Sequence, residues 1–402
     1  MSETEEILRI AAKGDGVTAS GLHVAGAAPG DLVDADGVVK RGEHYVQPAC
    51  KHFGKCGGCD LQHCDDASLA EFVRNRVVFA ARQHGLDPQT IAAVHLSQPK
   101  TRRRAALHAV NAGGGRAIIG FKEGGSHRVT DLRECHILEP CLFALVAPLR
   151  VWFSKRKDRY SADIDLALTD QGVDCSIRNI TVEGLEQTED LLEFCRVNGV
   201  ARLGLDQGYG PETFWEPEPV TITLGGVAVS FPEGSFLQAT LDGEKALVGA
   251  VSEWLKDCKA VADLFSGLGT FAFDLARTSQ VSAFEAARDA ILACNSAARM
   301  KGIAVDGRHR DLFRNPLRPD ELSAFDGIVL DPPRAGARAQ VEQLAQSSVP
   351  RIAYVSCNPS SWARDGALLI AAGYELAEVR PVGQFRWSTH VELASLFIKN
   401  GA

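Results

Sequence analysis

Short apolar runs alternate with helical patterns in the C-terminal half of the chain. AVADLF, VSAFEA, FDGIVLDPP and RIAYVSCNP are such runs, and the segments between them have the apolar spacing of helices. Strands that alternate with helices are typical of a doubly wound parallel sheet, which carries ligand-binding groups at the carboxyl ends of its strands. The pattern therefore predicts an α/β domain over residues 220–402.

The N-terminal half has a different pattern. Residues 5–45 alternate short β-like runs with glycine turns, as in a fragment of a small β-barrel. Ser68 to Gly85 has the spacing of an amphipathic helix, and mixed strands and a helix follow as far as the Pro- and Glu-rich stretch 210–220, interpreted as a linker. We therefore expect a shortened β-barrel-like segment (1–46) and an α+β central domain (47–219).

Composition adds limits to this picture. A chain of 402 residues is long for one ordinary core, and no apolar run approaches the roughly 20 residues of a membrane helix, so we expect several domains and no membrane span. The acidic start lacks the features of a secretory signal, so we expect a cytoplasmic protein. Its eleven cysteines then lie in a reducing compartment, where clustered cysteines are metal ligands or catalytic thiols rather than disulfides.

The charge is unevenly distributed along the chain. The net charge of -8 argues against a protein that coats nucleic acid, yet the segment Lys100 to Arg133 holds eight basic residues and only two acidic ones. A local basic face can bind phosphates even on an acidic protein. The segment is either an RNA-binding face or an ordinary solvated surface.

A glycine loop, Asp263 to Thr270, follows one apolar run and precedes a helix. Gly267 and Gly269 would let the backbone approach a ligand closely, and Glu285, 18 residues after Gly267, is suited to accept ribose hydroxyls. The third glycine of the dinucleotide fingerprint is missing, which favours S-adenosylmethionine over a nicotinamide cofactor. Asp311 and Asp331 would complete the rim of the cofactor site. The alternative is that the glycines and both aspartates serve only turns and that Glu285 is a surface charge.

Two loops at the ends of neighbouring strands carry the candidate chemistry, Asp331 to Gly336 and Ser356 to Pro359. Cys357 is a soft nucleophile at a strand end, where a thiolate can be activated. C5 of uracil becomes nucleophilic only after a thiolate adds to C6, and a base must then remove the C5 proton; Glu392, in the last strand, is the candidate base. The alternatives are a buried structural cysteine and a glutamate held in an ion pair.

A third group of residues has the spacing of metal ligands. Cys50, Cys56 and Cys59 lie close together in the sequence, and Cys135 follows further on. Four thiolates suit either zinc or a four-iron four-sulfur cluster, and spacing alone does not separate the two. Cys64 and Cys141 remain possible substitutes.

The segments CKHFGKCGGCDLQHC, DLFSGLGTF, DPPRAG, SCNP and HVE, in this order, resemble the RNA uracil-5 methyltransferase family, specifically its iron–sulfur members that act on bacterial 23S ribosomal RNA. This resemblance implies a class I (Rossmann-like) methyltransferase domain, RNA as the partner, Cys357 as nucleophile and Glu392 as base. We also expect a monomer. The implied cluster ligands are Cys50, Cys56, Cys59 and Cys135, and the implied cofactor contacts are Gln238, Phe265, Thr270, Glu285, Asp311 and Asp331.

The chain departs from the family pattern at several positions. Ser266 and Thr270 stand where the family usually has cysteine and asparagine, and Gly383 to Arg386 replaces its D-x-F-P segment. Two other functions are compatible with parts of the sequence. An RNA cytosine-5 methyltransferase is disfavoured because the DPPRAG loop lacks a cysteine, and an RNA-binding protein with a metal site and an inactive methyltransferase domain is disfavoured by the intact Cys357, Glu392 and Glu285.

Overall fold

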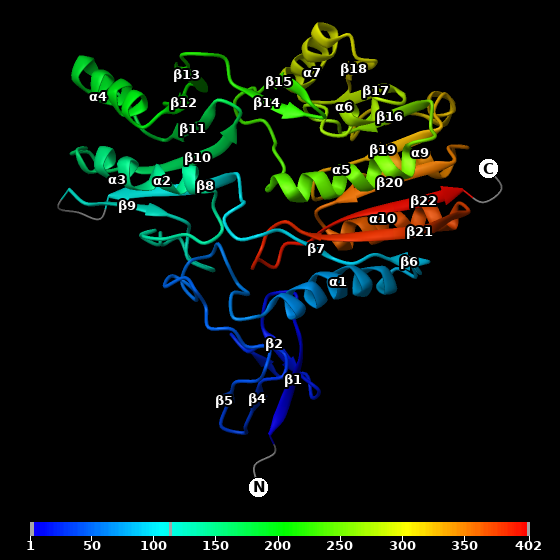
Figure 1. Cartoon of the computed structure of the whole chain (residues 1–402), viewed down its shortest axis with the longest axis horizontal. Helices are drawn as coiled ribbons and strands as arrows, with labels where there is room; N and C mark the ends of the chain where they lie inside the picture. The colour runs from blue at the N-terminus through cyan, green and yellow to red at the C-terminus, as the bar shows by residue number, and fades with distance from the viewer. Residues whose placement is uncertain (1–3, 112–114, 400–402) are drawn as a thin grey trace.

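The structure is a computed structural model that describes residues 4–111 and 115–399. Figure 1 shows three parts: a small sheet near the N-terminus, a six-stranded sheet with its helices, and a larger sheet that contains the C-terminus. No helix within the described residues is long and apolar enough to cross a membrane.

The N-terminal part is a sheet of short antiparallel strands in the order β3-β2-β1-β4-β5. Its core is small, with Ile7, Ala27 and Val33 buried at its centre. Within the described residues β3 and β5 are the edges of an open sheet. The strands are β1 (Glu5–Ile10), β2 (Gly16–Thr18), β3 (His23–Val24), β4 (Leu32–Val33) and β5 (Val39–Lys40).

The central part is a six-stranded sheet in the order β13-β12-β11-β10-β8-β9. Only β11 and β12 are parallel, and helix α4 connects them. Its elements are β8 (Arg104–Asn111), β9 (Ala117–Gly120), α2 (Pro140–Ala144), α3 (Val146–Ser154), β10 (Ser161–Thr169), β11 (Gly172–Arg178), α4 (Gly184–Val197), β12 (Val200–Asp206) and β13 (Pro211–Trp215).

Strand β13 corrects the expectation of a linker over 210–220. Residues 211–215 pair antiparallel with β12, so the connection to the next domain begins only after Trp215. Pro211 is the first residue of an edge strand, where its missing N–H is tolerated. A stretch rich in proline and glutamate is therefore compatible with an edge strand as well as with a linker.

The C-terminal part begins with a hairpin and continues into the doubly wound sheet that the pattern predicts. The sheet order is β18-β17-β16-β19-β20-β22-β21-β6, with β7 also paired to β21. The five strands from β18 to β20 are parallel, and β22 is inserted antiparallel between β20 and β21. The carboxyl ends of the parallel strands therefore share one edge with the start of β22.

The elements of this part are β14 (Thr221–Leu224), β15 (Val227–Ser230), α5 (Leu241–Leu255), β16 (Ala260–Leu264), α6 (Ala272–Leu275), β17 (Gln280–Glu285), α7 (Arg288–Lys301), β18 (Val305–His309), α8 (Pro319–Leu322), β19 (Gly327–Leu330), α9 (Arg338–Ala345), β20 (Arg351–Ser356), α10 (Pro359–Ala371), β21 (Tyr374–Gly383) and β22 (Glu392–Lys399). Apolar residues of α5, α6 and α7 cover one face of the sheet, and those of α9 and α10 cover the other.

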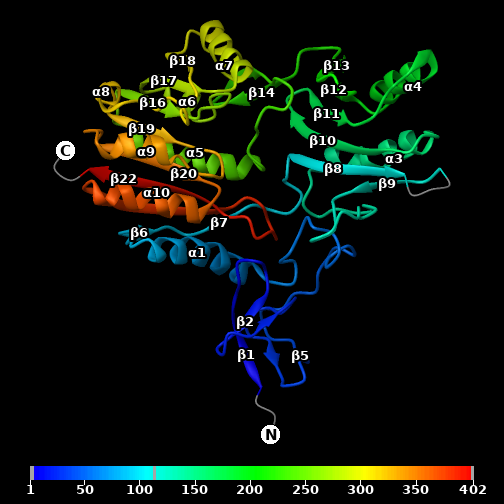
Figure 2. The same ribbon diagram turned by 180° about the vertical axis from the view of Figure 1, so that it is seen from behind.

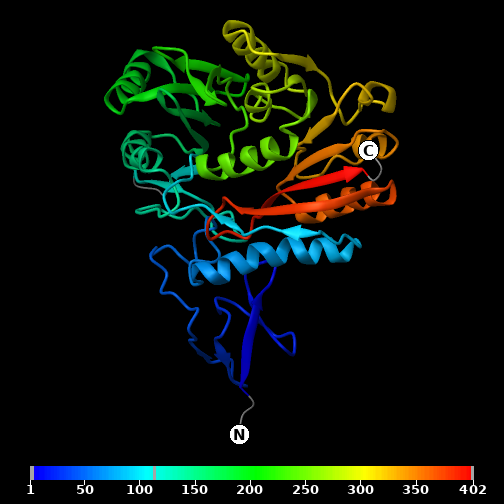
Figure 3. The ribbon, with the colours of Figure 1, turned by 45° about the vertical axis from the view of Figure 1, so that its right-hand side comes forward.

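A segment from the N-terminal half completes this sheet. Helix α1 (Asp66–Gln83) begins where the side chain of Asp65 accepts a 2.8 Å hydrogen bond from the Ser68 amide, and it buries Phe72, Val73 and Val77 against the layer of α9 and α10. Strands β6 (Thr90–Ile91) and β7 (His95–Leu96) pair in parallel with β21. Figures 2 and 3 show α1 running alongside α10 and β21. Residues 66–96, expected within the central domain, thus pack on the C-terminal sheet.

A buried ion pair joins the two larger parts. Arg103 precedes β8, and its guanidinium contacts the carboxylate of Glu244 in the first turn of α5. Both side chains are buried. Arg103 also donates a 3.0 Å hydrogen bond to the backbone carbonyl of Gln238. These contacts hold the start of β8 beside the loop that enters α5.

Candidate active site

The two reactive loops are held together at the carboxyl ends of β19 and β20. Cys357 follows β20 directly, and Asn358 is the N-cap of α10. The side-chain amide of Asn358 donates a 3.0 Å hydrogen bond to the carbonyl of Arg334, and the hydroxyl of Ser361 donates another at 3.0 Å. The loop that contains Asp331 is thereby fixed against the loop that contains Cys357.

Glu392 lies at the start of β22, beside the end of β20, where Ser356 pairs with Leu393. Its side chain is only 4% exposed. Burial raises the pKa of Glu392 to about 7, although a hydrogen bond from Gln384 and the charge of Arg104 lower it. The carboxyl group is therefore poised to exchange a proton near neutral pH, as a general base must.

Carboxyl groups surround the half-buried thiol of Cys357. Burial raises the pKa of Cys357, Glu392 and Asp331 raise it further, and Arg334 opposes them. Burial likewise raises the pKa of Asp331 well above its ordinary value, and the charge of Glu392 raises it further. The charge of the candidate base thus raises the pKa of the candidate nucleophile, and the thiol must lose its proton before it can attack.

A cavity of about 440 Å³ lies next to these residues, at the ends of β16 and β17. The loop after β16, the start of α7 and the loop 232–236 form its walls. Such a volume suits a nucleoside-sized ligand. The expected cofactor residues that line it are Phe265, Gly267, Thr270, Glu285 and Asp331.

Glu285 fixes the shape of the glycine loop. One carboxylate oxygen accepts a 2.9 Å hydrogen bond from the Gly267 amide, and the other accepts a 2.7 Å hydrogen bond from the Ala287 amide. Each oxygen keeps a second lone pair for a ribose hydroxyl. Phe265, also in this loop, has φ of 64°, a left-handed conformation that is costly for a residue other than glycine and is concentrated at ligand sites.

The three other expected cofactor residues have different surroundings. A Cβ at Gly269 would lie 2.8 Å from the ring of Phe273, so this glycine permits close packing. Asp311 accepts hydrogen bonds from the amides of its own turn, including that of Phe313 at 3.0 Å. Gln238 is buried and accepts a 2.9 Å hydrogen bond from Gln384. None of the three lines the 440 Å³ cavity.

The four expected ligand cysteines come together around one small cavity. Cys50, Cys56, Cys59 and Cys135 line it, whereas Cys64 and Cys141 do not. Burial raises the pKa of all four thiols, that of Cys59 to about 12. Over 4–111 and 115–399, no group of three or more His, Cys, Asp or Glu side chains is arranged to hold a metal ion. The donor set is nonetheless the one that a four-iron cluster takes.

The cysteine segment is also tied to the loop before Glu392. The carbonyl of Trp387 accepts hydrogen bonds from the amides of Asp60 at 2.7 Å and Leu61 at 2.9 Å. Phe385 of the same loop lies beside Arg102, whose guanidinium carbon is 5.4 Å from the ring centroid. The position of the candidate base therefore depends on how the cysteine segment folds.

The basic segment does not form one continuous face. Arg103 is paired with Glu244, and Arg102 and Arg104 line a further cavity between the central and C-terminal parts. The remaining basic side chains are exposed: Lys100, Arg116, Lys122, Arg128 and Arg133. Only this second group has the exposure that a phosphate-binding surface requires.

Two residues join the site that the sequence patterns did not assign to it. Phe236 is 58% exposed and lines the 440 Å³ cavity, and the guanidinium carbon of Arg104 lies 4.5 Å from its ring centroid. Gln384 is buried beside Glu392. For Phe236 the sequence offers one signal, an aromatic residue directly after Gly234 and Ser235, whereas no spacing rule points to Gln384.

Comparisons with known proteins show the family of the chain. A family model described as tRNA (Uracil-5-)-methyltransferase matches residues 309–400. An uncharacterized RNA methyltransferase of Zymomonas mobilis is 47% identical, over 98% of this chain and 100% of its own length. The 23S rRNA (uracil(1939)-C(5))-methyltransferase RlmD of Edwardsiella ictaluri is 31% identical, over 90% of this chain and 83% of its own length.

A solved structure shares the fold. The Pyrococcus abyssi tRNA (uracil-54, C5)-methyltransferase, in complex with S-adenosyl-L-homocysteine, has a TM-score of 0.75 over 98% of this chain and 100% of that chain, at 23% identity. Fold and site together define an S-adenosylmethionine-dependent RNA methyltransferase. The chain belongs to the RNA uracil-5-methyltransferase family. The cytosine-5 alternative and the inactive RNA-binding alternative are therefore set aside.

Proposed function

We propose that this enzyme methylates C5 of a uridine in 23S ribosomal RNA through a covalent bond between Cys357 and C6, with Glu392 as the base. The observation that carries the proposal is the position of Cys357 and Glu392 at neighbouring strand ends, where Ser356 pairs with Leu393, while Asp331, whose loop is hydrogen-bonded to that of Cys357, lines the 440 Å³ cavity. The identity to the 23S rRNA enzyme of Edwardsiella ictaluri supports the choice of RNA.

The chemistry assigns a separate step to each residue. Cys357 loses its proton to solvent and adds to C6, which makes an enolate and renders C5 nucleophilic. S-adenosylmethionine, when bound, supplies the electrophilic methyl group to C5. Glu392 in its ionised form then removes the C5 proton, the C5–C6 double bond forms again, and the thiolate of Cys357 is expelled.

Phe236 and Arg104 are suited to hold the target base. The exposed ring offers a face for stacking, and the guanidinium above it carries hydrogen-bond donors. Burial lowers the pKa of Arg104, while Glu392 and Cys357 raise it, so the positive charge of Arg104 is felt by both reactive groups. A uracil beside Arg104 and Cys357 would present its carbonyl oxygens to a cation.

The remaining residues would hold the two cofactors. Phe265, Gly267, Thr270, Glu285 and Asp331 would contact S-adenosylmethionine directly, whereas Gly269, Gln238 and Asp311 would shape the surrounding loops. Cys50, Cys56, Cys59 and Cys135 would bind a four-iron four-sulfur cluster. We assign the cluster a structural role, because the segment that holds it is hydrogen-bonded to the loop before Glu392.

A methylation assay on unmodified RNA tests the proposal. Purified enzyme would be incubated with labelled S-adenosylmethionine and either 23S rRNA or a tRNA pool, both transcribed in vitro, and the digested nucleosides would be identified by mass spectrometry. We expect 5-methyluridine in 23S rRNA and none with Cys357→Ala. Methylation of tRNA alone would overturn the choice of RNA, and 5-methylcytidine would overturn the choice of base.

A further inference from the structure

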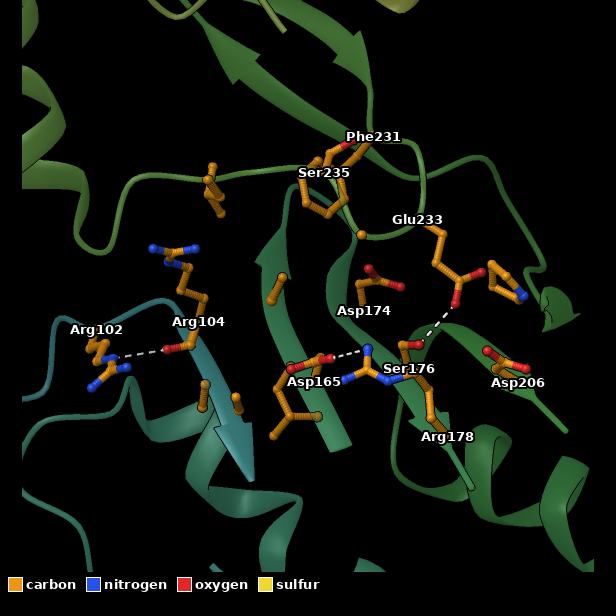
Figure 4. A pocket seen from close by; sticks show the side chains of 17 residues that line it. Arg102, Arg104, Asp165, Asp174, Ser176, Arg178, Asp206, Phe231, Glu233 and Ser235 are labelled. Carbon is orange, nitrogen blue, oxygen red and sulfur yellow. Dashed lines mark hydrogen bonds and ion pairs between the residues drawn. The ribbon is translucent and has the colours of Figure 1, made fainter. Parts of the chain in front are cut away.

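A second cavity, of about 540 Å³, adjoins the active site. Figure 4 shows it between the strands of the central sheet and the loop 231–237 of the C-terminal part. Glu233, Gly234 and Ser235 line both this cavity and the 440 Å³ cavity, so one short loop is the wall between them. Neither Cys357 nor Glu392 lines the second cavity, although Arg104 does. An occupant would therefore lie next to the target base.

Four carboxylates line this cavity. Both oxygens of Asp174 are bonded to Arg202, at 2.8 and 2.9 Å, so the other three give the cavity its chemical character. Asp165, Asp206 and Glu233 each use one oxygen in a contact with the protein, and within the described residues their other oxygens make no hydrogen bond or ion pair. The contacts are from Asp165 to Arg178 at 2.5 Å, from Asp206 to the amides of Gly208 at 2.8 Å and Gly210 at 3.1 Å, and from Glu233 to the hydroxyl of Ser176 at 2.9 Å.

The carboxylate of Glu233 is held in a fixed position. It packs directly against the backbone of Gly204 in β12, where a Cβ would overlap it. The hydroxyl of Ser176 in β11 donates to it from the neighbouring strand. The loop of the C-terminal part is thus anchored on the central sheet, and the acceptor oxygens are preorganised.

These groups select the class of ligand. A phosphate is disfavoured beside these three carboxylates, because their free oxygens are acceptors that would repel it and Arg178, the arginine next to them, is already paired with Asp165. The buried side chains of Phe231, Leu166 and Leu237 make part of the cavity lining apolar, as in a site for a flat ring. The cavity therefore fits a nucleobase whose edge carries several hydrogen-bond donors.

We propose that the second cavity binds a guanine of the substrate RNA beside the target uridine. Guanine carries an N1–H and a two-hydrogen amino group on one edge, whereas adenine and cytosine carry a single amino group there and uracil one N–H. Its O6 can accept from Arg178 while its donors meet the carboxylates. This inference rests on the proposed function only in taking RNA as the substrate.

An RNA-binding selection tests the proposal without requiring methyl transfer. Short single-stranded RNAs with one fixed uridine and randomised flanking bases would be mixed with the enzyme and S-adenosylhomocysteine, and the bound fraction would be sequenced. We expect guanine at one flanking position to be enriched about tenfold over uracil. Inosine at that position, which lacks the amino group, should lose most of the enrichment.

Asp206→Asn is the most informative variant. Asparagine keeps an oxygen for the two glycine amides but replaces the free acceptor by a donor, so guanine enrichment should fall to within about twofold of uracil. Asp165→Asn should act in the same direction. Asp34→Asn is the matched control. One side-chain oxygen of Asp34 accepts hydrogen bonds from the amides of Asp36 and Val38, at 3.0 Å and 2.9 Å, and Asp34 lines neither cavity.

The outcomes separate this inference from the proposed function. Absence of guanine enrichment in the wild type, enrichment of another base, or enrichment that both cavity variants keep would overturn the guanine site. Guanine enrichment that the cavity variants lose and the control keeps would support it. A wild-type enzyme that selects guanine yet forms no 5-methyluridine in rRNA would contradict the proposed function alone.

Discussion

The side-chain amide of Gln384 donates a 2.9 Å hydrogen bond to the side-chain oxygen of Gln238. Gln384 is 1% exposed and precedes β22, while Gln238 is 4% exposed and precedes α5. Gln384 also hydrogen-bonds Glu392, which lowers the pKa of that carboxyl against the effect of burial. One buried amide thus connects the candidate base to the loop at the entrance of α5, and it favours the ionised form of the base.

The first prediction concerns the pH dependence of turnover. Because Glu392 acts in its ionised form and its pKa is about 7, the rate limited by proton removal should fall as pH drops below about 7. Gln384→Met removes a hydrogen bond that favours the carboxylate, so the acid limb should move to higher pH. Single-turnover methylation measured across pH checks this. Gln346→Met is the control, because Gln346 follows α9 and is exposed. If the pH profiles of Gln384→Met and the wild type superimpose, the prediction is contradicted.

The second prediction concerns stability. The pKa of Glu392 rises from 4.5 to about 7 on folding, so its contribution to stability is fully present below pH 4.5 and is lost as pH rises through 7. Glu392→Gln should therefore match the wild type in acid and exceed it by about 3 kcal/mol above neutral pH. Urea unfolding at acid and alkaline pH measures the difference. If the difference in free energy of unfolding between Glu392→Gln and the wild type does not grow with pH, the assigned burial of the carboxyl group is contradicted.

The sequence predicted the doubly wound sheet and its reactive edge because these depend on local signals. Apolar runs set the strands, and the residues after them, Asp331 and Cys357, share an edge in any parallel sheet. Contacts between residues far apart in the chain could not be predicted from the sequence. The pairing of β7 with β21 and the partnership of Arg103 with Glu244 join residues far apart in the chain, and neither has a periodic signature. Spacing placed Glu285 near the cofactor but did not indicate that its oxygens also bind two backbone amides.

The third prediction separates two groups of arginines and lysines in the basic segment. Lys122 and Arg128 are exposed, so the double variant Lys122→Ala, Arg128→Ala should weaken RNA binding across sequences and reduce the slope of log affinity against log salt by about 1.4. Arg104→Ala should instead lower kcat/KM with little change of slope, because Arg104 lines the internal cavity. Filter binding at several salt concentrations provides the slopes. Equal effects of the two changes on the slope would contradict the division.

The fourth prediction concerns the cysteine site. Anaerobically purified protein should contain about four iron and four sulfide per chain, and Cys56→Ala should lose both. Cys141→Ala should keep them, because Cys141 is exposed and lies outside the cavity of the four cysteines. The Cys56 variant should also be less soluble, since the segment supports the loop before Glu392. Zinc in place of iron, or full activity of a metal-free variant, would contradict the assignment.

The central claim is that Cys357 and Glu392 perform separate steps on one covalent complex, and denaturing gel electrophoresis of enzyme with labelled 23S rRNA tests it most directly. Without the thiol no adduct forms, whereas without the carboxylate the adduct forms and methyl transfer can occur but elimination stalls. Glu392→Gln should therefore accumulate a protein–RNA band that resists denaturation and carries the methyl group, while Cys357→Ala and the double variant should show none. A band in the Cys357 variant, or turnover of Glu392→Gln at the wild-type rate, would contradict the account.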